Sequence, residues 1–267
     1  MNLMLIDAHC HLDDEQFGND LDAVIARAEQ AGVHAIITAG ANMMSSRAAV
    51  ALTERYERVF AVVGIHPQYA ETCDDKNFAA IRELASQRKV IGIGEIGLDF
   101  HYADGAPREM QERDFVAQLD LAAELGKPVV IHDRDAHAAV MDILRRRDVG
   151  KGVQLNAPTK RGILHCFSGD LAMAREAIDL GYLISFAGSV TFKNAPRLRA
   201  LAAALPLESI VIETDAPYLS PLRGKRNEPA NVARVAAKIA ELKGIETSLV
   251  EQTTTENCKA VFGLFIG

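Results

Sequence analysis

Eight short apolar segments recur along the chain, and several are separated by amphipathic stretches of helical spacing. They are continuous apolar runs rather than alternating ones, which is typical of parallel strands buried on both faces. The predicted strands are Leu3–His11, Ala35–Gly40, Val59–Pro67, Val90–Asp99, Pro128–Arg134, Gly162–Phe167, Tyr182–Gly188 and Ser209–Pro217. Strands that alternate with helices predict βαβ units, and eight such units predict an α/β fold closed into a (β/α)8 TIM barrel. An open, doubly wound sheet is the alternative.

Three of the predicted helices stop directly before a glycine, which supplies a left-handed cap at little cost. These helices are Asp20–Ala31, Arg108–Leu125 and Asp170–Leu180. Two further helices, about Pro229–Lys243 and Thr247–Phe262, follow the last strand. No Pro/Ser-rich linker or charge block divides the 267 residues. One barrel domain over residues 1–267 is therefore expected, because barrels of about 250 residues form single domains.

Charge and cysteine usage restrict the class of protein. The formal net charge is −7, whereas a protein that grips long duplex DNA through its phosphates is expected to be basic. Any nucleic-acid contact should therefore be local and metal-assisted. The four cysteines form no C-x-x-C pair, which argues against a disulfide framework and a cysteine-only zinc site. Without a visible signal or membrane span, we expect a cytoplasmic protein with no membrane contact and no obligate protein partner.

Metal-capable side chains stand at the ends of the predicted strands, on the face where a barrel enzyme forms its active site. His9 and His11 share one face of the first strand, because strand side chains alternate. The candidate ligands are His9, His11, Glu95, His132, His165 and Asp215. Burying so many polar groups costs on the order of several kcal/mol unless each is paired or ligated. A metal cluster is the simplest compensation.

The number of metal ions follows from the number of candidate ligands. Imidazoles mixed with carboxylates suit zinc, manganese, iron or cobalt better than calcium. Six ligands exceed what one tetrahedral catalytic zinc with an open position can use. Two ions that share a carboxylate would use all six, and such a pair activates water and clamps an ester or phosphodiester oxygen. A single ion is the alternative.

Cationic residues near the same face suggest the substrate. Arg134 shares a face with His132, and its fork-shaped guanidinium matches phosphate or carboxylate. The other members of this predicted rim are His66, Lys193 and Arg223, with Lys225 and Arg226. For Lys225 and Arg226 a solvated loop explains the charge equally well. The remaining histidines, which lie just before strand two, beyond strand four and in the next helix, are interpreted as structural or surface residues: His34, His101 and His137.

Seven ordered motifs resemble the TatD family of metal-dependent deoxyribonucleases, within the wider amidohydrolase-like barrels. They are DAHCHL at Asp7–Leu12, GIHP at Gly64–Pro67, GEIGLD at Gly94–Asp99, IHDRDA at Ile131–Ala136, HCFSG at His165–Gly169, ETDAPYLSP at Glu213–Pro221 and RGKRNEPANV at Arg223–Val232. The resemblance implies a one- or two-metal site built from the six candidate ligands, with Glu95 as the bridge. The expected cofactors are two divalent ions, magnesium, manganese or zinc.

The same resemblance implies roles for individual side chains. His66 and Arg134 would hold substrate phosphate, and Asp215 would orient or deprotonate the attacking water. Glu213 and Asp99 would support the ligands rather than bind metal themselves. The family pattern is departed from chiefly in the segment Asp148–Lys160.

The function expected from these residues is hydrolysis of DNA phosphodiester bonds by metal-activated water, with Asp215 and Glu95 as catalytic residues. Single strands or DNA ends are the expected substrate. A metal-dependent ester or amide hydrolase, such as a deacylase that removes D-amino acids from tRNA, is the alternative within the same chemistry. A non-catalytic metal-binding protein is the alternative from another class.

Overall fold

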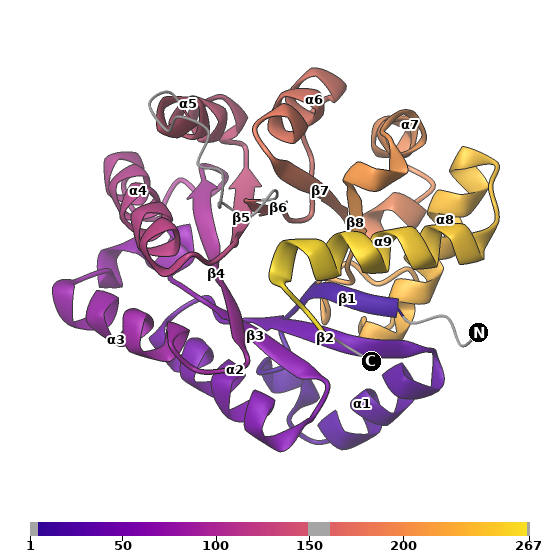
Figure 1. The fold of residues 1–267 in the computed structure, drawn as a ribbon, viewed down its shortest axis with the longest axis horizontal. Helices are drawn as coiled ribbons and strands as arrows, with labels where there is room; N and C mark the ends of the chain where they lie inside the picture. The colour runs from indigo at the N-terminus through magenta and orange to yellow at the C-terminus, as the bar shows by residue number, and fades with distance from the viewer. Residues whose placement is uncertain (1–4, 149–160, 266–267) are drawn as a thin grey trace.

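The computed structural model describes residues 5–148 and 161–265, and these form an eight-stranded parallel barrel (Figure 1). The strands are β1 (Leu5–Cys10), β2 (Val33–Ala39), β3 (Val59–Val63), β4 (Val90–Asp99), β5 (Val129–Arg134), β6 (Gly162–Leu164), β7 (Tyr182–Phe186) and β8 (Ile210–Ile212). They lie in sequential order from β1 to β8, and every neighbouring pair is parallel. The predicted TIM barrel is confirmed, since an open doubly wound sheet would reverse its strand order.

Helices surround the barrel. They are α1 (Leu21–Gln30), α2 (Met43–Arg55), α3 (Asp75–Ala85), α4 (Arg108–Leu125), α5 (His137–Asp148), α6 (Leu171–Asp179), α7 (Pro196–Ala204), α8 (Val232–Lys243) and α9 (Thr247–Phe262). Short 3-10 helices η1 (Glu15–Phe17), η2 (Pro67–Thr72), η3 (Gly188–Thr191), η4 (Leu207–Ser209) and η5 (Pro229–Asn231) lie in the connections. Gly126 caps α4 with a φ of 63°, as its position predicts. In the described ranges, no helix combines the length and apolarity needed to cross a membrane.

Some element boundaries differ from the sequence prediction. Strands β3, β6 and β8 end earlier, so His66, His165 and Asp215 lie in the connections just after them. Strand β2 begins two residues earlier than predicted, and His34 therefore lies within it. The segment Asp148–Lys160 falls outside the described residues from position 149 onward. That residues 1–267 form one domain stays a prediction.

The inside of the barrel is packed with small and branched side chains. Ile6 and Ala8 of β1 form one buried cluster with residues of other strands, among them Val130 and Leu183. The same cluster includes Cys258, Val261 and Phe262 of α9, which lies across one end of the barrel (Figure 1). A second, larger cluster packs the outer faces of the strands against the surrounding helices. The barrel interior next to α9 is therefore filled with apolar side chains, and the candidate ligands lie at the other end of the barrel.

The seam between the first and last strands closes beyond the end of β8. The backbone N–H of Asp215 donates to the carbonyl of His9 (3.0 Å), and that of His11 donates to the carbonyl of Ala216 (2.7 Å). Inside this seam, the Asp7 carboxylate accepts hydrogen bonds from the backbone N–H and the hydroxyl of Thr214 (2.8 and 2.6 Å). These bonds hold the connection after β8 against β1.

Two register shifts turn side chains of β1 and β4 toward the site. Asp7 pairs with Ile36, and Cys10 pairs with Thr38. Between these two pairs β1 advances by three residues and β2 by two, so β1 carries one extra residue. Strict alternation from the inward-facing Ile6 and Ala8 would point His9 outward, and the extra residue reverses this. A second shift, between Ile93 and Ile96 of β4, contains Glu95. Such bulges commonly re-aim side chains beside active sites.

Candidate metal centre and active-site cleft

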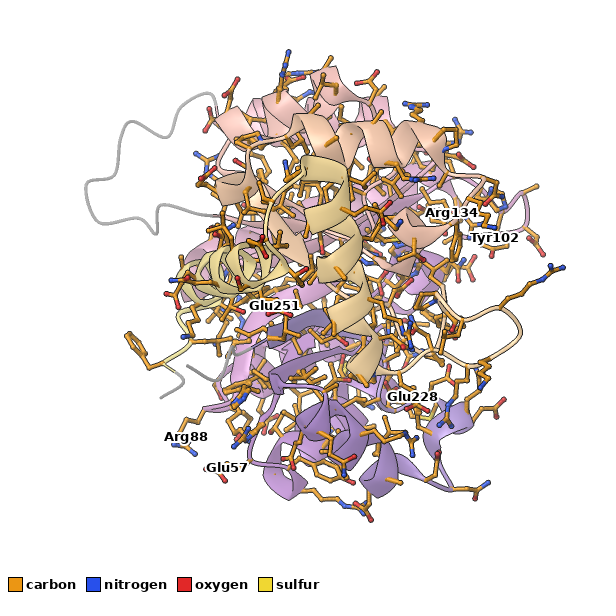
Figure 2. The ribbon with its side chains drawn as sticks, turned by 90° about the vertical axis from the view of Figure 1, so that its right-hand side faces the viewer. Glu57, Arg88, Tyr102, Arg134, Glu228 and Glu251 are labelled. Carbon is orange, nitrogen blue, oxygen red and sulfur yellow. The ribbon has the colours of Figure 1, made fainter. Side chains whose placement is uncertain are left out.

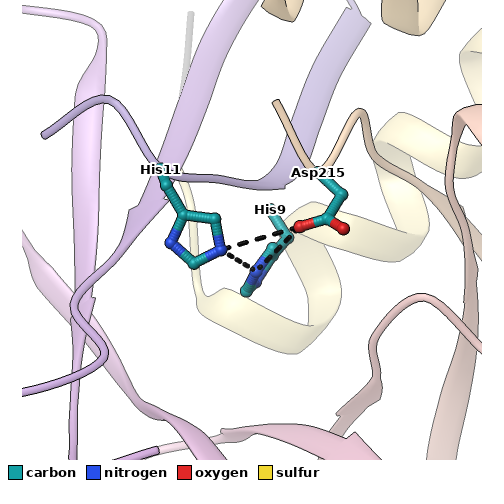
Figure 3. A group of neighbouring side chains, drawn as sticks. All are labelled: His9, His11 and Asp215. Carbon is teal, nitrogen blue, oxygen red and sulfur yellow. Dashed lines mark hydrogen bonds and ion pairs between the residues drawn. The ribbon is translucent and has the colours of Figure 1, made fainter. Parts of the chain in front are cut away.

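His9, His11 and Asp215 bring three ligand-type atoms together across the seam (Figure 3). The Nε2 atoms of His9 and His11 lie 3.3 Å apart, and both face Asp215 Oδ1, at 3.8 and 3.6 Å. Glu95 Oε2 completes the group, at 3.7 Å from His9 Nε2 and 3.6 Å from His11 Nε2. Ligand atoms bound at about 2.1 Å to one tetrahedral ion are about 3.4 Å apart, so this spacing suits a metal ion.

Backbone contacts fix two of these side chains. Nδ1 of His11 donates to the carbonyl of Ala39 (3.2 Å), which leaves Nε2 to face the site. Asp215 adopts a left-handed φ of 56°, which is uncommon outside glycine and concentrates at functional sites. Its N–H bonds to His9 and its carbonyl accepts from the N–H of Tyr218 (2.9 Å), so the conformation is held on both sides.

Glu95 divides its two oxygens between two groups of histidines. Oε2 faces His9 and His11, whereas Oε1 lies 2.8 Å from His132 Nδ1 and 2.8 Å from His165 Nε2. These last two nitrogens are 3.2 Å apart. A carboxylate whose oxygens face separate sets of nitrogens has the arrangement that a bridge between two ions requires.

His165 is held from behind by a buried glutamate. Its Nδ1 lies 3.3 Å from Glu213 Oε1, while its Nε2 faces Glu95. Glu213 also accepts hydrogen bonds from the backbone N–H of Cys166 (2.7 Å) and from the hydroxyl of Ser185. Its oxygens are thus engaged away from the centre, an arrangement that fits a supporting carboxylate.

His66 lies beside the same group. It caps η2 by accepting a hydrogen bond from the N–H of Gln68 at Nδ1 (3.1 Å). When the ring is neutral, Nε2 therefore carries the proton, and it points to Glu95 Oε1 at 3.5 Å. Burial, only partly offset by the charge of Glu95, lowers the pKa of His66 to about 3. A neutral Nε2–H donor suits an anionic substrate oxygen better than a metal ion.

The buried carboxylates of this group require positive charge nearby. Burial alone would lower the pKa of His11, but the nearby carboxylates of Asp215 and Glu95 raise it to about 9. His165 likewise has a pKa well above its usual value, because the charge of Glu95 and the contact with Glu213 outweigh burial. Burial also opposes ionisation of Glu95, yet neighbouring histidines hold its pKa well below the usual value. Without metal, protons on these histidines therefore balance the charge of the carboxylates, and bound divalent ions would take over that role.

Five of the six candidate ligands, all except His9, line a cleft of about 770 Å³, which is within the usual size range of ligand sites. Arg134 lines this cleft and is exposed; its NH1 donates to the Tyr102 hydroxyl (3.1 Å). Figure 2 shows the two side chains together at one end of the barrel, opposite Glu57 and Arg88.

The remaining predicted cationic residues lie elsewhere. Lys193 and Arg223 are exposed, and neither is among the described residues that line the cleft. Their predicted contact with substrate stays a prediction. Arg226 pairs with Asp20 (2.8 Å) and Glu228 (3.2 Å), which gives it a structural role in the loop.

Several supporting residues were not identified from the sequence. Gln118 of α4 is buried and forms two hydrogen bonds to the backbone of Ile65 (2.8 and 2.9 Å), which fixes the residue before His66. Asn227 donates to the carbonyls of Thr214 and Tyr218 (2.8 and 2.7 Å) and so anchors the connection that carries Asp215. A polar residue in an amphipathic helix gives no local signal of this role. Asn227, in contrast, lies within the RGKRNEPANV motif.

Comparison with known proteins identifies the family. The model of the TatD related DNase family matches residues 6–263. The chain belongs to this family. As a member of the TatD family it is a metal-dependent hydrolase, and the recognition from its motifs is confirmed.

Individual TatD relatives agree over the full length. The chain is 40% identical to the uncharacterized metal-dependent hydrolase YabD of Bacillus subtilis over 97% of this chain and 99% of YabD. It is 36% identical to the 3′-5′ ssDNA/RNA exonuclease TatD of Klebsiella pneumoniae over 97% and 98% of the two chains. The crystal structure of the TatD homolog YjjV from Escherichia coli superposes with a TM-score of 0.89 at 34% identity, covering 99% of this chain and 100% of YjjV.

Proposed function

We propose that this chain hydrolyses phosphodiester bonds in DNA, with two divalent ions, magnesium, manganese or zinc, held at its metal centre. The observation that carries the proposal is the position of Glu95 between two sets of histidines. A centre for one ion would not require a carboxylate with both oxygens facing nitrogen ligands. Relatives named as ssDNA/RNA exonucleases support a nucleic-acid substrate.

The donor atoms divide naturally into two ligand sets that share Glu95. One set would consist of His9, His11 and Asp215, and the other of His132 and His165. Bound ions would supply an activated water and would neutralise charge on the phosphoryl oxygens. The nitrogen and carboxylate donors fit zinc or manganese, and availability decides between metals with similar preferences.

The protein side chains perform the remaining tasks. Asp215 lines the cleft, and its carboxylate would accept a proton from the attacking water. The guanidinium of Arg134 would bind a phosphate oxygen, and Tyr102 holds it in position from the side. His66 would donate from Nε2 to a second oxygen, since its Nδ1 is occupied by the Gln68 N–H.

We propose unpaired strands or DNA ends as the substrate, a cytoplasmic location and no obligate protein partner. Lys193 and Arg223 would contact strand segments beyond the cleft.

Cleavage of 3′-end-labelled single-stranded DNA tests the proposal. The protein is stripped with a chelator, and magnesium, manganese or zinc is added back. We expect digestion that is restored by metal and lost in Asp215→Ala, which excludes a contaminating nuclease. If a folded protein that binds two ions digests no DNA with any of these metals, the DNA substrate is wrong, and the substrate would instead be an aminoacyl ester.

A further inference from the structure

Exposed aromatic and thioether side chains are concentrated around the cleft. In the part of the chain that the structure describes, the large apolar side chains that are exposed are Met44, Tyr69, Tyr102, Tyr218, Leu249 and Phe265. The first four all line the cleft, whereas the other two lie elsewhere. Exposed apolar groups that cluster at one site mark a binding surface. We call Tyr69, Tyr102 and Tyr218 the tyrosine rim.

The tyrosine rim surrounds the metal centre. Tyr69 belongs to η2, three residues after His66, and Tyr102 follows β4. Tyr218 follows β8, and its ring centroid lies 6.1 Å from that of His11. Strands β4 and β8 are four places apart in the order of eight, so Tyr102 and Tyr218 stand on opposite sides of the centre. Tyr69 stands beside Tyr102, because β3 adjoins β4.

Two of these rings are held in place through their hydroxyl groups. The hydroxyl of Tyr218 donates to Asp14 Oδ2 (2.9 Å), and that of Tyr102 accepts from Arg134, whose guanidinium carbon is 5.1 Å from the ring centroid. The rings stay exposed by 50% and 45% although their polar ends are anchored. Fixed aromatic faces of this kind lose little entropy when a flat group stacks on them.

Charge in the cleft limits how a polyanion can bind there. The described lining includes six carboxylates and one guanidinium, so its formal charge with neutral histidines is −5. Two divalent ions would leave −1. These carboxylates are Asp13, Asp14, Glu95, Asp99, Asp133 and Asp215. The cleft can accommodate the phosphate that reacts, but it cannot attract a run of phosphates. Inside the cleft, affinity for a strand must therefore come mainly from contacts other than phosphate contacts, and the bases offer the largest apolar faces for them.

We propose that the tyrosine rim stacks the unpaired nucleobases on both sides of the phosphodiester that is cleaved. This inference rests on the proposed nuclease function and adds a reason for single-strand selectivity. Bases in a duplex are already stacked and paired, so their faces are unavailable to the rim. Aromatic stacking tolerates any base, so the rim selects strand state rather than sequence.

Fluorescence of 2-aminopurine tests the proposal by binding rather than by cleavage. The probe is a single-stranded oligonucleotide with 2-aminopurine near its 3′ end and phosphorothioate linkages that resist hydrolysis, added to the metal-loaded protein. We expect quenching on binding, and a dissociation constant about fivefold to hundredfold weaker in Tyr69→Leu or Tyr102→Leu. Tyr69→Phe keeps the ring and should bind within about threefold of the unchanged protein.

Phe265→Leu is the matched control, because Phe265 is an exposed aromatic residue away from the cleft. It should bind as the unchanged protein does. An oligonucleotide with abasic positions in place of the stacked bases should bind weakly, and equally, to the unchanged protein and the Leu variants. For cleavage, the Leu variants should raise KM more than they lower kcat, and the binding constant should fall with salt only as one or two phosphate contacts require.

If the Tyr→Leu variants bind as tightly as the unchanged protein, or if the bound probe is not quenched, the tyrosine rim does not stack the bases. A steep salt dependence with no effect of the variants would instead indicate binding through phosphates. If the probe is bound and quenched but no DNA is cleaved with any metal, the nuclease proposal fails while the rim stands.

Discussion

The carboxylate of Asp99 lies 3.4 Å from Nε2 of His132, and Glu95 lies 2.8 Å from Nδ1 of the same ring. His132 is thus held between a carboxylate that faces the centre and one that lies behind it. Asp99 is itself fixed by hydrogen bonds from the Gln68 side chain (3.2 Å) and the His101 N–H (3.0 Å). A carboxylate behind a ligating histidine sets its orientation and raises its basicity.

Asp99→Asn should therefore lower kcat/KM and metal affinity by about 10- to 100-fold without unfolding the barrel. The amide keeps the size of the side chain but removes the charge that supports His132. Metal titration and steady-state cleavage measure the two effects. Asp179→Asn, an exposed carboxylate in α6, is the control. Unchanged metal affinity in Asp99→Asn would show that His132 needs no support.

Metal binding should release protons. His11 has a pKa of about 9 without metal, so it is protonated at neutral pH, and an ion can bind only after that proton leaves. The apparent metal affinity should therefore rise with pH up to about 9 and fall at lower pH. Isothermal titration calorimetry in buffers with different ionisation enthalpies measures the protons released. Identical heats in every buffer would contradict this prediction.

Divalent metal should also stabilise the fold, because its ligands come from both sides of the seam. An ion at about 100 times its Kd adds about 2.7 kcal/mol, which corresponds to a rise in Tm of about 5–10 °C for a chain of this size. Asp215→Ala should lose most of this rise, whereas Asp179→Ala should keep it. Thermal unfolding with and without metal provides the measurement. An equal rise in both variants would place the stabilising ion elsewhere.

Gly97 permits the close approach of β4 to β5 beside His132. Its φ is 143°, and a Cβ atom at this position would lie 2.0 Å from the carbonyl oxygen of His132. Gly97→Ala should destabilise the fold by at least about 2 kcal/mol and displace His132, with loss of activity. Gly18→Ala is the control, since Gly18 has a helical φ of −53° and a looser contact at 3.3 Å. Denaturant unfolding of both variants decides the question.

The sequence predicted the barrel and the side chains that gather at one end of it, because both follow local patterns. Continuous apolar runs mark the buried strands, and ionisable residues at their ends converge once the barrel closes. Alternation correctly placed His9 and His11 on one face. It could not show that this face points into the barrel, because the register shift after Asp7 depends on pairing with β2. The same holds for Glu95 in β4.

The sequence could not show which distant residues hold the site in place, or where the connecting loops run. Gln118 occupies a polar position in α4, and only the packing of that helix against the His66 segment buries it. Arg134 extends a strand, so its position followed from the barrel. Lys193 and Arg223 lie on connections whose course depends on tertiary contacts, and the expected approach to the cleft is not seen for either.

The seam has a consequence for the timing of activity during protein synthesis. His9 and His11 of the first strand are synthesised well before Asp215 and Ala216, whose backbone groups align the segment after β8 with β1. A nascent chain, or one truncated before β8, lacks this candidate ligand and could not complete the proposed centre. If the proposed centre performs the hydrolysis, partial chains would be inactive, and activity would begin only when β1 and the segment after β8 meet.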